Sequence, residues 1–310
     1  PFSAGWPYRA TSMAAVRTFH HARFAADDLV AAKGSRRISL CLPARDEATT
    51  VGAIVASVQQ ALVRDAPLVD EILVLDDHST DATAQVAAAA GARVVAAADV
   101  APEFGAEPGK GQALWKTVLA STGDLIVWCD ADLRDFDPAF VTGLLGPLLT
   151  EPDVQFVKGF YERPETGAQP GGGRVTELLA RPALALLHPA LAAMVQPLSG
   201  EYAARRSLVE ALPFVEGYGV DIGLLLDALA AVGVRGLAQV DLGSRYHRNR
   251  TLAELSVQAT EVLHTILDRA GVTGLPDAVV LDRPAAGPAR VRVGQRPAPL
   301  SLDTYQRRTA

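Results

Sequence analysis

The stretch Asp124-Leu-Ile-Val-Trp-Cys-Asp130-Ala-Asp132 decides the fold of this chain and points to its chemistry. An apolar run typical of a buried strand ends in two aspartates that are one residue apart. Two carboxylates this close repel each other unless a cation lies beside them, and hard divalent cations prefer such oxygen ligands. A cation held there could bridge to a diphosphate. The alternative is an exposed turn after a strand, because aspartate is common in turns.

Short apolar strands alternate with helices on both sides of this stretch. The pattern predicts strands at 38–42, 71–75, 93–95 and 125–129, and helices at 25–33, 49–64, 80–90, 110–119 and 137–149. Such alternation is typical of an α/β fold in which a mostly parallel, Rossmann-like sheet is covered by helices on both faces. Ligands of these sheets bind at the carboxyl ends of the strands.

Candidate ligand-binding residues, most of them carboxylates, follow three of the four predicted strands. They are Pro43 and Glu47 after the first strand, Asp76 and Asp77 after the second, and Asp130 and Asp132 after the fourth. Because these strand ends share one edge of the sheet, we expect the side chains to meet there. In the usual strand order the first and fourth strands are neighbours, so Cys41 and Cys129 should lie close together as reduced thiols.

Two glycine-flanked cations stand just before predicted helices. Lys110 lies in Glu107-Pro-Gly-Lys-Gly111, and Arg174 follows Gly171-Gly-Gly173, with Thr176 in the next helical turn. Glycines allow close backbone approach, a helix N-terminus favours anions, and the cation adds charge, so each segment suits a phosphate. The alternatives are a solvated loop lysine and a glycine linker before an ordinary helix.

Three further residues of the second half carry weaker indications. His247 lies among arginines, which disfavour its proton, and a neutral imidazole is a good metal ligand. It could complete a site begun by Asp132, although the residues alone favour a basic surface loop with one histidine. Glu201 and Asp221 fall in segments predicted to be irregular, where either carboxylate could orient a sugar hydroxyl or be a satisfied polar residue.

Composition bounds the class of protein. The chain has 310 residues, 49% of them hydrophobic, and a net charge of -6, which argues against a nucleic-acid-binding surface. No run reaches the ~18 uninterrupted apolar residues of a membrane helix. The N-terminus lacks the apolar core and cleavage site of a signal peptide. Its two cysteines fall in predicted strands, so we expect a cytoplasmic protein with no membrane contact.

Several segments together resemble a known family, the glucosyl-3-phosphoglycerate synthases. These are retaining glycosyltransferases of the A-type fold in glycosyltransferase family 81, related to the mannosyl-3-phosphoglycerate synthases. The matching segments are LPARDEATTV (42–51), VDEILVLDDHSTDAT (69–83), PGKGQALWK (108–116), GDLIVWCDADL (123–133), GGGRVTELLARP (171–182), QPLSGEYAARR (196–206), GYGVDIGLLLD (217–227) and HRNR (247–250). GGGRVTEL, QPLSGEYA and HRNR are the most specific.

The resemblance implies a hexosyltransferase that uses a nucleotide-sugar and D-3-phosphoglycerate. The donor would be UDP-glucose, GDP-glucose or GDP-mannose, and the cofactor Mg²⁺ or Mn²⁺. The implied residues are Pro43, Ala44, Arg45, Glu47 and Asp77 for base and ribose; Lys110, Asp130 and Ala131 along the donor; Asp132 and His247 for the metal; Gly173, Arg174, Thr176 and Asn249 for the acceptor; and Lys110, Asp132, Glu201 and Asp221 for catalysis. Asp221 matches a family glutamate, so glucose and mannose both stay open.

The resemblance also implies a division of the chain and an assembly. We expect an N-terminal extension (1–37), a nucleotide-sugar-binding half (38–153), an acceptor-binding half (154–270) and a C-terminal segment (271–310) with little periodicity. A homodimer is expected, through apolar helices of the second half.

Three other functions compete with this one. A polyprenyl-phosphate sugar transferase shares the first two strand-end motifs, but it would need a membrane-contacting segment. A nucleotide-sugar sensor would bind the donor without turnover. A nicotinamide dehydrogenase is excluded, because its glycine fingerprint should follow the first strand, where the chain has Pro43-Ala-Arg-Asp-Glu47.

Overall fold

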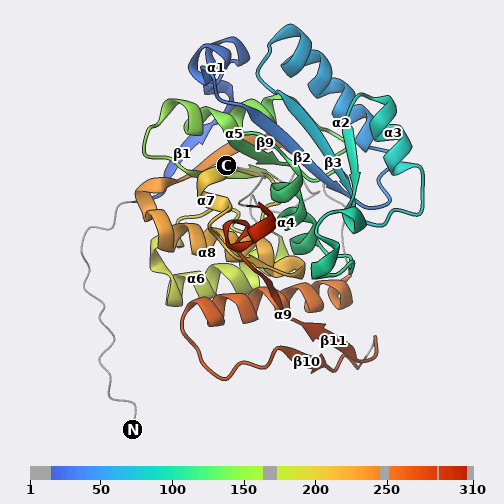
Figure 1. The fold of residues 1–310 in the computed structure, drawn as a ribbon. Coiled ribbons are helices and arrows are strands. Elements are labelled where there is room, and N and C mark those ends of the chain that lie inside the picture. The colour runs from blue at the N-terminus through green and yellow to red at the C-terminus, as the bar shows by residue number, and fades with distance from the viewer. Residues whose placement is uncertain (1–14, 163–172, 245–250, 285, 306–310) are drawn as a thin grey trace.

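An eight-stranded sheet runs through the computed structural model of the chain, which describes residues 15–162, 173–244, 251–284 and 286–305 (Figure 1). The strands follow the order β1-β9-β6-β7-β5-β2-β3-β4. Their bounds are β1 Arg17–His20, β2 Ile38–Ala44, β3 Glu71–Asp76, β4 Arg93–Ala96, β5 Leu125–Trp128, β6 Phe156–Glu162, β7 Tyr202–Arg205 and β9 Leu237–Ser244.

The sheet is mostly parallel, as the sequence predicts. β2 pairs in parallel with both β3 and β5, so the first and fourth strands of the sequence prediction are neighbours. Cys129 N accordingly donates to Cys41 O at 3.4 Å, and neither cysteine forms a disulfide. Among the strands described in this sheet, β7 alone runs antiparallel to both of its neighbours, β5 and β6. The start of β7 therefore lies at the edge where β5 and β6 end.

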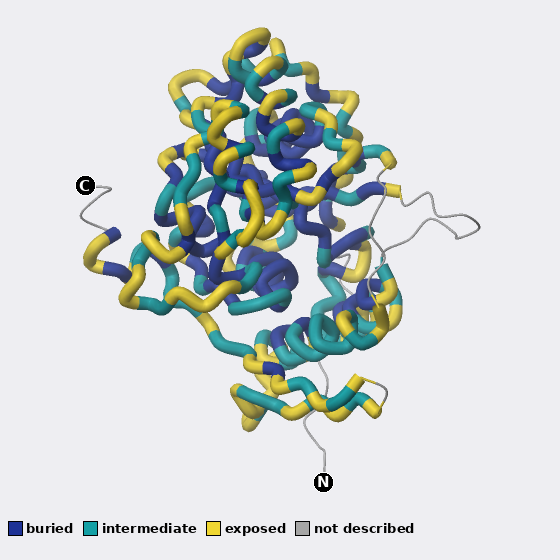
Figure 2. Tube along the Cα trace, turned by 90° about the vertical axis from the view of Figure 1, so that its right-hand side faces the viewer, coloured by how far each residue is buried: buried dark blue, intermediate teal, exposed yellow. Residues whose placement is uncertain are grey.

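Helices cover both faces of the sheet (Figure 1). Their bounds are α1 Ala26–Lys33, α2 Val51–Val58, α3 Thr83–Ala89, α4 Lys110–Ala120, α5 Ala139–Thr150, α6 Arg181–Leu187, α7 Arg206–Val209, α8 Val220–Val232 and α9 Leu252–Arg269. One apolar core lies between the sheet and α2 and α5, and a second lies between the sheet and α4 and α8. Figure 2 shows the buried residues gathered in this interior.

The helix predicted at 49–64 begins after Thr50, at Val51. Thr50 occupies the N-cap position of α2 but makes no side-chain capping bond. Its hydroxyl instead donates to Ala131 O at 2.7 Å. The helix also continues past α2 as a π-helical segment, Gln59–Asp65.

The N-terminal extension contributes an edge strand that the sequence does not predict. β1 pairs in parallel with β9, from Arg17 opposite Ala238 to His20 opposite Asp241. Its four residues, Arg-Thr-Phe-His, contain no apolar run, and pairing with a strand more than two hundred residues away leaves no local pattern.

Part of the C-terminal segment is also built into the fold. β10 (Ala278–Leu281) and β11 (Ala289–Arg292) form a hairpin, and β12 (Gln295–Arg296) pairs with β8 (Phe214–Val215). Trp115 Nε1 donates to Pro297 O at 2.8 Å, and Leu302 and Tyr305 are buried. These elements are too short for the periodicity that sequence analysis requires.

Within the ranges described, no helix combines the length and the apolar character needed to cross a membrane.

Removing the end of the C-terminal segment should destabilise the protein. A chain that stops at Gly294 loses β12 and the buried Leu302 and Tyr305. Burying one large apolar side chain contributes about 1.5–3 kcal/mol, and about 1 kcal/mol shifts the melting temperature of a domain of roughly 200 residues by about 2–4 °C. We expect a fall of at least about 5 °C in a thermal melt followed by circular dichroism. A matched chain that stops at Tyr305 keeps every contact named here, so equal melting temperatures would contradict the prediction.

Candidate active site

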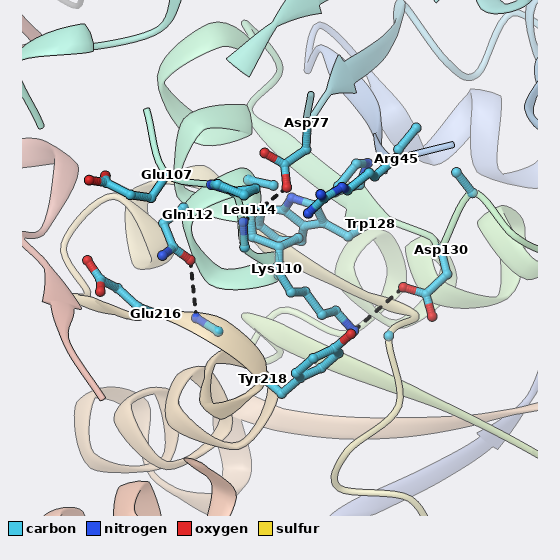
Figure 3. A pocket seen from close by; sticks show the side chains of 18 of the residues that line it. Arg45, Asp77, Glu107, Lys110, Gln112, Leu114, Trp128, Asp130, Glu216 and Tyr218 are labelled. Carbon is cyan, nitrogen blue, oxygen red and sulfur yellow. Dashed lines mark hydrogen bonds and ion pairs between the residues drawn. The ribbon is translucent and has the colours of Figure 1, made fainter. Parts of the chain in front are cut away.

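The carboxyl ends of β2, β3 and β5 open onto one cavity of about 830 Å³, here called the strand-end cavity (Figure 3). It contains every residue that the sequence analysis placed at the donor, together with the first of the two implied metal ligands. These are Pro43, Ala44, Arg45, Glu47, Asp77, Lys110, Asp130, Ala131 and Asp132. The predicted convergence of three strand ends is therefore present in the fold.

Close backbone contacts hold the aspartate turn in place. The bond from Thr50 to Ala131 O ties the turn to the start of α2. On its other side lies Gly200, where a Cβ atom would come within 2.3 Å of an Asp130 carboxylate oxygen. A glycine is needed there because the carboxylate occupies the space of a side chain. The motif around Gly200 and the aspartate motif thus fit each other.

Lys110 is the first residue of α4 and lies between two carboxylates. Its Nζ is 2.8 Å from Asp221 Oδ2 and 3.6 Å from Asp130 Oδ1. Figure 3 shows its side chain reaching toward Asp130 beside Tyr218. Burial alone would lower the pKa of the ammonium, but Asp130 and then Asp221 outweigh burial and hold that pKa above its usual value. Lys110 is therefore a fixed positive charge at the wall of the cavity.

Negative charge is concentrated on the other side of the cavity. Burial raises the pKa of the Glu47 carboxyl, and the nearby charge of Asp132 raises it further, with a smaller contribution from Asp130. A carboxyl whose pKa is raised by neighbouring carboxylates lies in an excess of negative charge, which a cation would relieve.

The donor set fits a hard divalent cation bound with its substrate. Mg²⁺ and similar ions are often held by one or two carboxylates together with substrate phosphates. Asp130 and Asp132 could supply these carboxylates. Among the described residues no group of three His, Cys, Asp or Glu side chains is arranged to hold a metal. His247, the second implied ligand, lies outside the described residues.

Glu201 and Asp221 are both buried next to the cavity; Glu201 lies in an irregular position, as the sequence predicts, whereas Asp221 lies in a helix. Glu201 immediately precedes β7, so the antiparallel direction of that strand brings it to the strand-end edge. Asp221 belongs to the first turn of α8, where the sequence predicted no helix, and is 2% exposed. It does not line the cavity itself but reaches it through Lys110.

Sequence reasoning missed the wall that the second half of the chain contributes. Tyr218 lies in the GYG segment before α8, and Glu216 pairs with Arg296, Nε to Oε1, at 3.0 Å. Arg296 also donates to Phe104 O. The second half lines the cavity with Glu216, Tyr218 and Glu261, and the other lining residues not assigned from the sequence are Arg292 and Arg296 of the C-terminal segment and Phe104, Glu107 and Gln112 of the first half. The GYG segment was visible in the sequence, but nothing there indicates contact with the C-terminal segment.

The acceptor residues implied by the resemblance are not gathered at this cavity. Gly173, Arg174 and Thr176 lie just before α6 and do not line it, with Arg174 exposed and Thr176 buried. Asn249 lies outside the described residues. The acceptor set therefore stays a prediction.

Comparisons with known proteins bear on this arrangement. Residues 39–187 match the profile of the family described as Glycosyl transferase family 2. The chain is 51% identical over 250 residues to the glucosyl-3-phosphoglycerate synthase of Mycolicibacterium smegmatis, covering 79% of this chain and 82% of that protein. The protein of the same name from Petrotoga mobilis is 45% identical over 260 residues, covering 82% and 80%.

Solved structures are similar as well. Glucosyl-3-phosphoglycerate synthase from Mycobacterium tuberculosis, in complex with Mn²⁺, UDP-glucose and phosphoglyceric acid, matches with a TM-score of 0.84 and 43% identity, covering 92% of this chain and 98% of that one. A structure of the same enzyme with Mn²⁺, UDP and glucosyl-3-phosphoglycerate matches with a TM-score of 0.82 and the same identity and coverage of this chain. With this identity across almost the whole fold, and with the strand-end motifs in place, the chain belongs to the glucosyl-3-phosphoglycerate synthase family.

Proposed function

We propose that this protein transfers glucose from UDP-glucose to D-3-phosphoglycerate with retention of the anomeric configuration, in the presence of Mn²⁺ or Mg²⁺. The observation that carries the proposal is the placement of Lys110 between Asp130 and Asp221 on a cavity lined by the strand-end residues, in a chain 51% identical to a glucosyl-3-phosphoglycerate synthase. The related structures with UDP-glucose support glucose over mannose and UDP over GDP.

The arrangement of the cavity supports an orientation for the donor. Arg45, Glu47 and Asp77 lie at the ends of β2 and β3, which suits the base and ribose. Asp77 is braced there, because Gly109 N donates to its Oδ2 at 3.0 Å. Lys110 and the turn from Asp130 to Asp132 lie farther along the rim and suit the diphosphate.

Asp130 and Asp132 would hold the divalent cation, with His247 as the ligand that family resemblance adds. When bound, the cation supplies positive charge to the diphosphate as it departs.

The residues of the chain then account for the rest of the chemistry. The bond from C1 to the diphosphate oxygen breaks, and negative charge grows on the departing UDP beside Lys110. The acceptor hydroxyl oxygen forms the new bond to C1 from the same face, and its proton passes to the departing phosphate oxygen. Asp221 and Glu201 are oriented but buried, which supports a role in holding the sugar rather than attacking it. A trapped covalent glycosyl-enzyme on either residue would contradict this mechanism.

The reaction is tested by release of nucleoside diphosphate from UDP-glucose, GDP-glucose and GDP-mannose, with Mn²⁺ or Mg²⁺, in the absence of lipid. We expect rapid release from UDP-glucose only when D-3-phosphoglycerate is present, and none after chelation of the metal. Release that ignores phosphoglycerate would indicate another acceptor, and binding of a donor without release would indicate a sensor.

Two substitutions should separate the donor and acceptor roles. Lys110→Met removes the charge beside the departing diphosphate, so we expect kcat to fall by about 100-fold or more with the KM for phosphoglycerate little changed.

Arg174→Ala removes a proposed acceptor contact, so the KM for phosphoglycerate should rise at least about 10-fold while kcat changes little. Steady-state kinetics measures both.

A control lysine is available for the first substitution. Lys33 is also largely buried and pairs with Asp70 at 2.7 Å, but it lies in α1, away from the cavity. Lys33→Met should leave kcat unchanged. Equal losses in the two lysine variants would assign the effect of Lys110→Met to stability.

The proposal includes a cytoplasmic homodimer. The apolar side chains Leu178, Leu186 and Leu252, exposed near α6 and α9, support a contact between copies. Cys41 and Cys129 form no disulfide with each other, which supports a reducing compartment. Light scattering should give twice the mass of one chain, and the mass of a single chain would contradict the dimer. Activity found in a membrane fraction would contradict the location.

A further inference from the structure

Lys158 is a lysine buried beneath the strand-end cavity to which neither the sequence analysis nor the proposed reaction gives a role. It lies in β6, directly opposite Tyr202 of β7 and Gln239 of β9, and is 1% exposed. Lysine is almost never fully buried unless its charge is compensated. Its position in the sheet points its side chain toward the layer that contains α4 and α8.

The contacts of Lys158 converge on Asp221. Its Nζ donates to Asp221 O at 3.1 Å and lies 4.2 Å from the centre of the Tyr202 ring. The Asp221 carboxylate meanwhile contacts Lys110 at 2.8 Å. Asp221 thus has one lysine at its side chain and another at its backbone carbonyl. Lys158 therefore contacts the backbone of the first turn of α8, while the Asp221 carboxylate contacts Lys110 at the cavity wall.

Stability alone does not explain this lysine. Burial lowers the pKa of its ammonium to about 8, although the charge of Asp221 partly offsets burial. A positive charge beside the N-terminal turn of a helix is also unfavourable. An apolar side chain of similar volume would fill the same space without these costs. A buried charge at Lys158 lowers the stability of the folded protein, and Lys158 contacts the first turn of α8. We therefore consider it for a role in positioning that turn.

We propose that Lys158 is a positioning residue for glucosyl transfer, and that it acts by holding Asp221 in register with Lys110. This proposal rests on the proposed function. Lys158 does not line the strand-end cavity, so it acts through Asp221 rather than on the substrates. Asp221 Oδ1 is buried, and the Asp221 carboxylate also interacts with the buried Tyr202 hydroxyl, so the direction of this oxygen depends on how the first turn of α8 is held.

The test is a double-mutant cycle of Lys158→Met with Asp221→Asn, read by kcat and by the Kd for UDP from tryptophan fluorescence. In the wild-type background we expect Lys158→Met to lower kcat about 10- to 100-fold, as for a small misplacement of a reacting group. In the Asp221→Asn background the same change should lower kcat by no more than about 2-fold, because the two act as a unit. The Kd for UDP should stay within about 2-fold in both, since the base and ribose residues are untouched.

Controls separate positioning from stability. Lys33→Met removes a largely buried lysine elsewhere and should leave kcat and UDP binding unchanged. If Lys158→Met does not fold, Lys158→Gln keeps a donor for the carbonyl and enters the same cycle. Equal fold-losses of kcat in the two backgrounds, or no loss in either, would overturn the proposal while wild-type turnover still supports the function. Wild-type protein that binds UDP-glucose but never releases UDP would overturn the function, and the role of Lys158 with it.

Discussion

The ion pair between Lys110 and Asp221 is the interaction on which the site depends. It joins the first residue of α4, from the part of the chain that carries the strand-end motifs, to the first turn of α8, from the second half. Both side chains are largely removed from water, where breaking one partner of a pair leaves an uncompensated charge. The geometry of the cavity wall is therefore coupled to the packing of both helices. Residues 38–153 and 154–270 share one sheet, and the two ends of this ion pair come from the two parts, so neither part builds the wall alone.

The antiparallel direction of β7 brings residues of the second half of the chain to the cavity wall. If β7 ran parallel to its neighbours, Glu201 would lie at the far edge of the sheet. Because it is reversed, its first residue, Tyr202, lies beside the end of β5 and opposite Lys158 of β6, and Glu201 directly precedes it. Trp128 of β5 and Lys158 of β6 both lie opposite Tyr202. The pairing of β7 with its two neighbours therefore fixes the positions of both the aspartate turn after β5 and the buried lysine. The close fit of Gly200 to Asp130 follows from this reversal.

The meeting of the strand-end residues at one cavity could be predicted from the sequence, and the other wall of that cavity could not. Glu47, Asp77 and Asp130 each follow a local apolar run, and the rule that parallel strands end at one edge brings them together. The position of Asp221 depends on the direction of β7 and on the length of the loop before α8, neither of which has a local pattern. Arg292 and Arg296 reach the cavity only because β12 pairs with β8, a two-residue ladder that no periodicity reveals. Lys158 reads in sequence as one lysine in an apolar strand.

The charge of the cavity makes donor and cation binding interdependent. Glu47, Asp77, Asp130 and Asp132 all line it, and the pKa of Glu47 is raised by burial and, next, by the charge of Asp132. A nucleoside diphosphate brought to this rim alone adds negative charge to a surface that already has an excess. Lys110 offsets only part of it, because its ammonium already interacts with Asp130 and Asp221. A divalent cation at the aspartate turn replaces repulsion of the diphosphate by attraction. The cation and the donor should therefore raise each other's affinity by the same factor. The acidic rim thus favours a donor that arrives with its metal over a free nucleotide.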